Sequence, residues 1–203
     1  MIDNAGSRLA VGIVLLGIGI ALTLEARLGI SPFDVLHQGI ARQTGLSIGT
    51  VVILVGLAIL LLWIPLRQRL GVGTVINALT VGALIDLGVW LLPAPDALAV
   101  RWLYLTGGIV VTGLGMGLYI SAGLGPGPRD GLMTGIAARG HPIWLVRTGL
   151  EATALILGWG LGGDVGIGTV VFAFSIGPIG HYFIELLDIE EPAMDLGPGT
   201  AAE

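Results

Sequence analysis

The sequence contains no cysteine and no lysine, and charged residues of either sign are scarce. Without cysteine the chain cannot form disulfide bonds, thiolate metal sites or a cysteine nucleophile. All nine basic residues are arginine, charged residues make up only 11% of the chain, and no basic run of the kind that binds nucleic acid occurs. We therefore expect no nucleic-acid partner.

The motifs of common soluble enzymes are also missing. The chain has no HExxH metalloprotease motif, no GxSxG nucleophile elbow and no Walker motif, and its three histidines are scattered rather than clustered. These absences predict a protein that is not an enzyme and that holds neither a cofactor nor a metal ion. The alternative is an intramembrane enzyme that would contact a lipid headgroup through Arg147, His181 and Asp86.

Apolar sequence is abundant. Hydrophobic residues make up 54% of the chain, and the mean hydropathy is +0.94. A domain of 203 residues could not hide so much apolar surface in one core, so we expect the lipid bilayer to cover the rest. The net charge of −5 says little about partners, because four acids lie together near the C-terminus: Glu190, Glu191, Asp195 and Glu203.

Six stretches are long and apolar enough to cross about 30 Å of hydrocarbon, which takes about 20 helical residues. Tryptophans fall near the ends of these stretches, where their amphipathic rings favour the membrane interface. The stretches are approximately 9–26, 47–66, 72–92, 101–122, 143–162 and 167–187, and the tryptophans are Trp63, Trp90, Trp102, Trp144 and Trp159. The sequence therefore predicts an all-α polytopic membrane protein with six transmembrane helices.

The chain repeats itself. Residues 17–41 match residues 113–137 at a constant offset of 96, with 12 of 25 positions identical. After a one-residue deletion, residues 71–82 match residues 166–177, with 6 of 12 identical. Each copy carries three predicted spans, and an odd number makes the second copy enter the membrane from the opposite side. We therefore expect two inverted three-helix repeats related by a pseudo-two-fold axis in the membrane plane.

These repeats divide the chain into residues 1–95, residues 96–188 and an acidic tail at residues 189–203. Of the arginines outside the spans, five lie on one side of the predicted membrane and three on the other. Because arginine accumulates in cytoplasmic loops, this excess predicts that both termini and the tail are cytoplasmic. The expected location is the inner membrane of a bacterial cell.

Each repeat has a break between its first and second spans. Ser31-Pro32-Phe33-Asp34 has the pattern of a helix start, with serine at the N-cap, proline at the first helical position and an acid three residues after the cap. Gly127-Pro128-Arg129-Asp130 repeats this pattern with glycine at the cap. The short helix that follows each break is either interfacial, with Asp34 and Asp130 as simple caps, or re-entrant, with the acids lining a cavity.

Ionisable and polar residues inside the spans are candidates for a pathway, because burying them in lipid is costly. Arg147 and Glu151 lie four residues apart on one helix face, and either neutralise each other or contribute to a polar path. Asp86 in the third span and His181 in the sixth are equivalent by repeat, and both either reach water or join the same path. Asn77 is a polar position of the third span.

The break Leu28-Gly29-Ile30-Ser31-Pro32-Phe33-Asp34 and the later Gly71-Val72-Gly73-Thr74 resemble the YczE/YyaS/YitT group of small bacterial membrane proteins, and its YczE-like branch above all. The resemblance covers residues 8–188. It implies an integral membrane protein of the bacterial envelope without a settled biochemical activity, and it suggests a link to lipopeptide production. It implies no residue roles.

Inverted repeats with paired breaks favour a small secondary transporter of an anionic or zwitterionic solute. A non-transporting accessory or scaffold protein is the alternative, and GxxxG faces such as Gly113/Gly117, Gly131/Gly135 and Gly158/Gly162 would then hold a partner or form a homodimer. For the transporter, we expect the breaks to meet at a polar cavity that also receives Arg147 and His181. The candidate pathway residues are Asp34, Asp130, Arg129, Arg147, Glu151, His181, Asp86 and Asn77.

Overall fold

The computed structural model describes residues 4–187, and every regular element in that range is an α-helix. The helices are α1 (Ala5–Ala26), α2 (Pro32–Thr44), α3 (Ile48–Leu66), α4 (Val72–Leu91), α5 (Leu98–Ser121), α6 (Pro128–Ala137), α7 (Ile143–Gly160) and α8 (Ile167–Leu186). The predicted all-α fold is confirmed. The predicted acidic tail at residues 189–203 lies outside the described residues.

Five of the described helices are long and apolar enough to span a membrane: α1, α3, α4, α5 and α8. The remaining predicted span, α7, is not among them, and it carries Arg147 and Glu151 among its 18 residues. The helices α2 and α6 are the short helices predicted after the two breaks. Each begins with proline, whose fixed φ suits the first helical position, as the sequence predicts.

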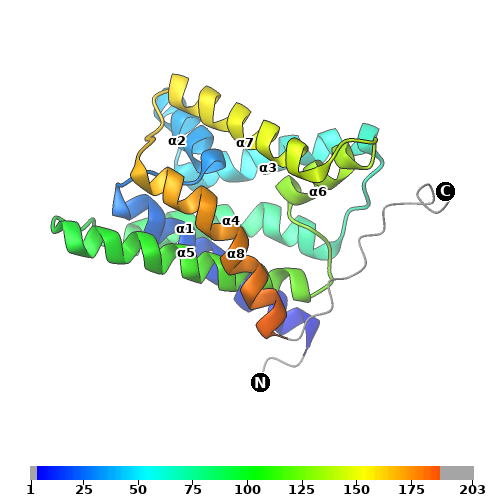
Figure 1. Ribbon diagram of the computed structural model, residues 1–203, viewed down its shortest axis with the longest axis horizontal. Coiled ribbons are helices and arrows are strands. Elements are labelled where there is room, and N and C mark those ends of the chain that lie inside the picture. The colour runs from blue at the N-terminus through cyan, green and yellow to red at the C-terminus, as the bar shows by residue number, and fades with distance from the viewer. Residues whose placement is uncertain (1–3, 188–203) are drawn as a thin grey trace.

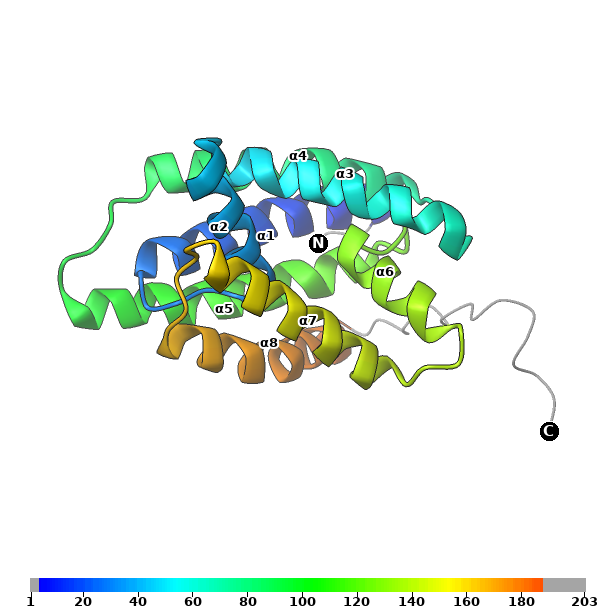
Figure 2. The same cartoon turned by 90° about the horizontal axis from the view of Figure 1, so that it is seen from above.

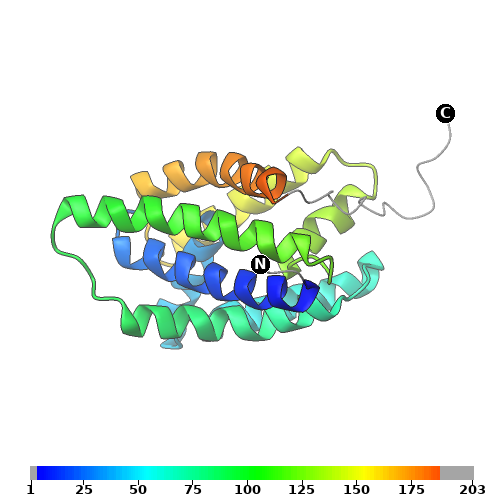
Figure 3. The ribbon, with the colours of Figure 1, turned by 90° about the horizontal axis from the view of Figure 1, so that it is seen from below.

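The helices form two layers (Figure 1). One layer runs in the order α4, α1, α5, α8, with α1 and α5 at its centre (Figure 3). The other holds the two short helices, with α2 packed on α7 and α6 packed on α3 (Figure 2). Each short helix therefore packs on a long helix from the other half of the chain. The halves differ in one respect: α3 packs on α4, whereas their counterparts α7 and α8 barely touch.

Glycine brings α1 and α5 into backbone contact. A Cβ atom at Gly12 would lie 2.7 Å from the backbone nitrogen of Tyr119, and one at Gly115 would lie 2.8 Å from that of Leu16. Both distances are shorter than real Cβ contacts, so a side chain at either position would push the helices apart. Small residues allow this close packing in membranes, where dispersion between helices replaces the hydrophobic effect.

The predicted GxxxG glycines are largely used inside the chain. A Cβ at Gly113 would lie 2.5 Å from Ile179, and one at Gly131 would overlap the ring of Trp63. A Cβ at Gly158 would lie 2.4 Å from the backbone nitrogen of Leu36. These glycines therefore accommodate neighbouring helices of the same chain.

The two breaks make the same contact with opposite halves. The carbonyl of Leu28 accepts a hydrogen bond of 2.7 Å from the amide of Gly168, and the carbonyl of Leu124 accepts one of 2.8 Å from Gly73. Leu28 and Leu124 are equivalent by repeat, and so are Gly73 and Gly168. Each break is thus tied to the start of the last helix of the other repeat.

Trp63 differs from the expected interfacial position. It is only 1% exposed, and its indole Nε1–H donates a 3.1 Å hydrogen bond to the carbonyl of Pro128 at the start of α6. Trp90, Trp144 and Trp159 remain largely exposed, as anchors at a membrane interface would be. Trp63 instead fixes a short helix to α3, because a buried indole needs a hydrogen-bond acceptor.

Candidate functional site

A cavity of about 180 Å³ lies where the two breaks meet. Most of its wall is apolar and comes from α1, α3, α4, α5 and α8. Its polar residues come mainly from the starts of α2 and α6 and from α5: Ser31, Asp34, His37, Asn77, Thr112, Tyr119, Arg129 and Asp130. Four of the candidate pathway residues, Asp34, Asn77, Arg129 and Asp130, are therefore brought together.

Asp34 is buried at the start of α2, with 6% of its surface exposed. The hydroxyl of Ser31 donates a hydrogen bond of 2.5 Å to Asp34 Oδ2, and Ser31 Oγ accepts one of 3.2 Å from the Asp34 amide. Asp34 Oδ1 lies 3.3 Å from Nδ1 of His37, which is also buried. Asp34 therefore takes part in the helix cap and also faces an ionisable partner in the cavity wall.

The equivalent acid, Asp130, has a different environment. Its side chain is 46% exposed, and its nearest charged partner is the adjacent Arg129, with Nε 4.0 Å from Asp130 Oδ1. The guanidinium of Arg129 lies over the ring of Phe33, 5.1 Å from the ring centroid. This cation–π contact joins the start of α6 to the start of α2.

Helix α5 adds two polar groups to the cavity wall. The hydroxyl of Tyr119 donates a 2.9 Å hydrogen bond to the carbonyl of Gly125, which holds the second break against α5. Thr112 is 6% exposed, and its Oγ1 has no hydrogen-bond partner within the described part of the chain. Thr112 therefore leaves a hydrogen-bonding group beside the cavity unused by the protein.

Asp86 does not line the cavity. It accepts hydrogen bonds of 2.8 Å from the amide of Gly49 and 2.6 Å from the hydroxyl of Ser47, both at the start of α3. The first amides of a helix have no partner within it, and a carboxylate there also meets the positive end of the helix dipole. In this structure Asp86 caps a neighbouring helix.

The three predicted ionisable residues of α7 and α8, Arg147, Glu151 and His181, also lie outside the cavity wall, contrary to the expectation for Arg147 and His181. Arg147 Nε lies 3.2 Å from Oε1 of Glu151, so this pair is intrahelical. His181 Nε2 lies 3.3 Å from Oε1 of Glu185, and both side chains are about two-thirds exposed. In each pair the two side chains interact along one face of their own helix, so neither needs a charged partner in the other half of the chain.

His37, Thr112 and Tyr119 are polar cavity residues that sequence reasoning missed, and a sequence signal was available for His37. His37 follows Asp34 by three residues, which places both side chains on one face of α2. That spacing was the available signal. Among the described residues, no group of three or more histidine, aspartate or glutamate side chains could hold a metal ion. The cavity chemistry therefore rests on one imidazole, two carboxylates and one guanidinium.

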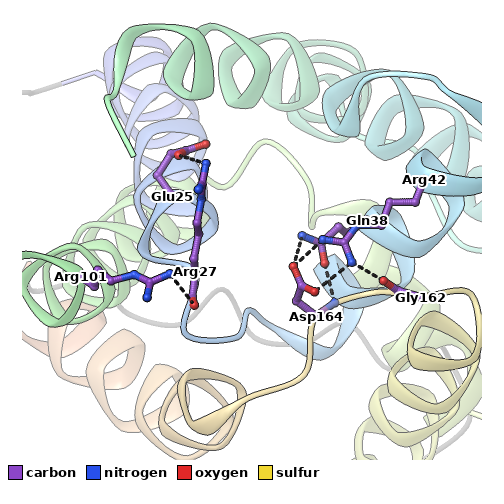
Figure 4. A network of polar contacts seen from close by, with 7 residues as sticks. All are labelled: Glu25, Arg27, Gln38, Arg42, Arg101, Gly162 and Asp164. Atoms are coloured by element: carbon purple, nitrogen blue, oxygen red, sulfur yellow. Dashed lines mark hydrogen bonds and ion pairs between the residues drawn. The ribbon is translucent and has the colours of Figure 1, made fainter. Parts of the chain in front are cut away.

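The far end of α2 is fastened to the loop between α7 and α8 (Figure 4). Arg42 pairs with Asp164 through two hydrogen bonds, of 2.5 and 2.9 Å, and also donates to the carbonyl of Gly162. Gln38 donates to Asp164 Oδ2 and accepts from the Asp164 amide. The hydrogen bond from Arg42 lowers the pKa of Asp164 below its ordinary value, despite partial burial. We call this cluster of Gln38, Arg42, Gly162 and Asp164 the α2 latch.

Comparison with known proteins gives the chain a family. Residues 7–185 match a family of unknown function, DUF6198. The chain belongs to this family. It is 43% identical to an uncharacterized protein of Haemophilus influenzae over 174 residues, which cover 85% of this chain and 80% of that one. No solved structure matches it.

Two relatives come from Bacillus subtilis. The uncharacterized membrane protein YczE is 37% identical over 172 residues, covering 83% of this chain and 80% of its own length. The uncharacterized protein YyaS is 30% identical over 185 residues, covering 88% and 91%. The YczE-like resemblance is confirmed. Together with the five apolar helices, it identifies a multi-pass membrane protein.

Proposed function

We propose that this member of the DUF6198 family is a small secondary transporter of a zwitterionic solute, held in the bacterial inner membrane with both termini cytoplasmic. The observation that carries the proposal is the cavity formed where two repeat-related breaks meet, with Asp34 and Asp130 in its wall. Transporters commonly bind solutes between such repeats, at discontinuous helices.

Charge favours a zwitterion over a simple anion. The cavity wall holds two acids and one permanent cation, Arg129, which already interacts with Asp130 and Phe33. A single anionic solute would meet more negative than positive charge. A zwitterion could direct its anionic group towards Arg129 and the start of α6, and its cationic group towards the acids.

The proposed topology has six spans in two inverted repeats, with α7 as the fifth span along the chain. An 18-residue helix is about 27 Å long, which nearly matches the hydrocarbon layer. Pairing between Arg147 and Glu151 lowers the cost of placing both in this helix. Support for the inversion comes from the reciprocal bonds of Leu28 and Leu124 into opposite halves.

The accessory or scaffold alternative has less support. Its GxxxG faces would have to bind a partner or a second copy, whereas Gly113, Gly131 and Gly158 accommodate neighbouring helices of the same chain. A homodimer through these faces would have to displace those helices.

Uptake into proteoliposomes tests the proposal. Liposomes with the purified full-length protein are incubated with a mixture of amino acids and other small zwitterions, and retained compounds are identified by mass spectrometry. We expect at least one compound to accumulate, and Asp34→Asn and Asp130→Asn each to reduce its initial rate at least about tenfold through loss of a charged contact. Glu185→Gln, an acid outside the cavity, should keep the rate.

Asparagine has nearly the shape of aspartate and can still accept the hydrogen bond from Ser31 at position 34, and the side chain of Asp130 is about half exposed, so these variants should still fold. Gel filtration in detergent checks this. No accumulation beyond empty liposomes, or wild-type rates in both cavity variants, would contradict a transport site at these acids.

A further inference from the structure

The geometry points to a proton-binding site at the Asp34–His37 pair, and hence to H⁺ as the coupling ion. The coupling rests on the proposed transport function, whereas proton binding at the pair does not. The pair sits in the cavity wall at the start of α2, with both residues more than nine-tenths buried.

The orientation of His37 leaves one ring nitrogen available. Nδ1 faces Oδ1 of Asp34 at 3.3 Å, and a carboxylate there holds the imidazole proton on Nδ1. Nε2 then carries the lone pair, and it has no hydrogen-bond partner among residues 4–187. A carboxylate on one side makes the opposite nitrogen a better base, as in the acid–histidine pairs of hydrolases.

Few other charges face this pair. Helix α6 contributes Arg129 and Asp130 to the same cavity, and α5 contributes the Tyr119 hydroxyl. Of the helices packed on α2, α3 has no ionisable residue, and α7 carries only Arg147 and Glu151, which pair with each other. Of these groups, Arg129 favours the ionised form of Asp34, and Asp130 lies beside Arg129 with the opposite charge.

Charge balance favours the protonated pair in a buried site. With neutral His37 and ionised Asp34, the pair carries one negative charge. A proton added at Nε2 turns it into an imidazolium–carboxylate pair with no net charge, which is easier to bury than a lone carboxylate. Ser31 keeps its bond to Asp34 Oδ2 in both states, so protonation requires no rearrangement of the helix cap.

Proton binding changes the charge of the cavity by one unit. A charged group of the solute meets that change directly, so proton and solute affinities must influence each other equally. This reciprocity is the thermodynamic basis of coupling.

The chain has only three histidines, which makes the site measurable. Full-length protein labelled with ¹⁵N-histidine and held in lipid nanodiscs is titrated by NMR. We expect wild-type His37 to occupy the Nδ1–H tautomer when neutral and to gain its proton at Nε2. Since the tautomer is read in the wild-type protein, this part does not depend on any variant folding.

Matched substitutions separate the two acid–histidine pairs. Asp34→Asn should lower the ratio of the Nδ1–H to the Nε2–H tautomer of neutral His37 about tenfold, through loss of the charged acceptor, and leave His181 unchanged. Glu185→Gln should affect only His181, its neighbour on α8. A His37 that stays neutral throughout, takes the Nε2–H tautomer, or ignores Asp34→Asn would overturn the proton site.

Coupling is then tested in the proteoliposomes. An imposed pH gradient should change the initial uptake rate several-fold in the wild type and have no effect in His37→Gln. Uptake that ignores the gradient in the wild type would overturn the coupling. Absent uptake with the expected His37 titration would instead contradict the transport proposal and leave the proton site standing.

Discussion

At the scale of single residues, the two copies of the break have diverged where they meet the cavity. Asp34 and Asp130 are equivalent, but the partners of Asp34 are not repeated. Ser31 corresponds to Gly127, Phe33 to Arg129, and His37 to Met133. Only the first copy therefore has a hydroxyl and an imidazole around its acid, while the second has a guanidinium beside it. The cavity is consequently asymmetric in chemistry although it is built from a repeat.

The glycines of the second break allow a direct test of the backbone. Gly125 has φ of 115°, and a Cβ there would lie 2.8 Å from the Cα of Gly71. Gly125→Ala combines an unfavourable dihedral with a backbone clash, and should cost about 1–3 kcal/mol in the free energy of unfolding. The midpoint of thermal unfolding of the purified protein measures this.

Two glycines nearby in sequence provide matched controls. Gly123 has φ of 64°, but a Cβ there would have no atom within 4 Å, so Gly123→Ala should cost only about 1 kcal/mol. Gly107 lies in α5 with open space around it, and Gly107→Ala should be neutral or stabilising. If the Gly125→Ala protein were as stable as the Gly107→Ala protein, the close contact between the second break and the start of α4 would be contradicted.

At the scale of elements, the α2 latch holds the short helix against the α7–α8 loop. Arg42 lowers the pKa of Asp164 in the folded protein, so ionised Asp164 stabilises the fold above its unfolded-state pKa of about 3.9. That contribution disappears as the pH falls through the lower folded-state pKa. Both side chains are about half exposed, so Asp164→Asn should cost only about 0.5–1 kcal/mol at pH 7.

The stability difference between wild type and Asp164→Asn should therefore shrink as pH is lowered from 7 to below 4. Thermal unfolding of both proteins across that range measures it. Glu25→Gln is the control for removing an acid from a weak ion pair, because Glu25 and Arg27 are 3.8 Å apart and Arg27 is mostly exposed. A difference that persisted undiminished at pH 3 would show that Asp164 stabilises the loop without its charge.

Local sequence signals predicted the elements well. Proline and a capping pattern marked the starts of α2 and α6, and apolar length marked the long helices, because both signals act within a few turns of one helix. Partners across helices were less predictable. Trp63 lies near a helix end, as interfacial tryptophans do, yet the contact that buries it comes from Pro128, 65 residues later.

At the scale of the whole molecule, the sequence identified the breaks and two of their acids, but not the full wall of the cavity. The sequence left Asp86 either reaching water or lining a path, and only the placement of α3 beside α4 shows that it caps a helix instead. For Arg147 the structure shows the intrahelical pair with Glu151 that its spacing offered as one alternative. His181 pairs with Glu185 one turn away on its own helix, which repeat equivalence could not reveal.

The packing of the halves also bears on the proposed transport. Each short helix packs on a long helix of the other half, and α3 packs on α4 while α7 and α8 barely touch. In alternating access, the two halves exchange arrangements as the shared site opens first to one side of the membrane and then to the other. The two repeats must therefore pack unequally around that site.

The most direct test of the central claim is the reactivity of a single cysteine in the cavity, measured from each face of the membrane. The native chain has no cysteine, so Asn77→Cys is the only target in that variant. A small membrane-impermeant thiosulfonate is applied to right-side-out and to inverted vesicles, with Arg69→Cys and Asp96→Cys as markers of the cytoplasmic and external faces. If the protein is an alternating-access transporter, each marker cysteine should react from one face of the membrane. Asn77→Cys should react from both faces, but more slowly. Reaction of Asn77→Cys from one face only would contradict a transport cavity between the two repeats.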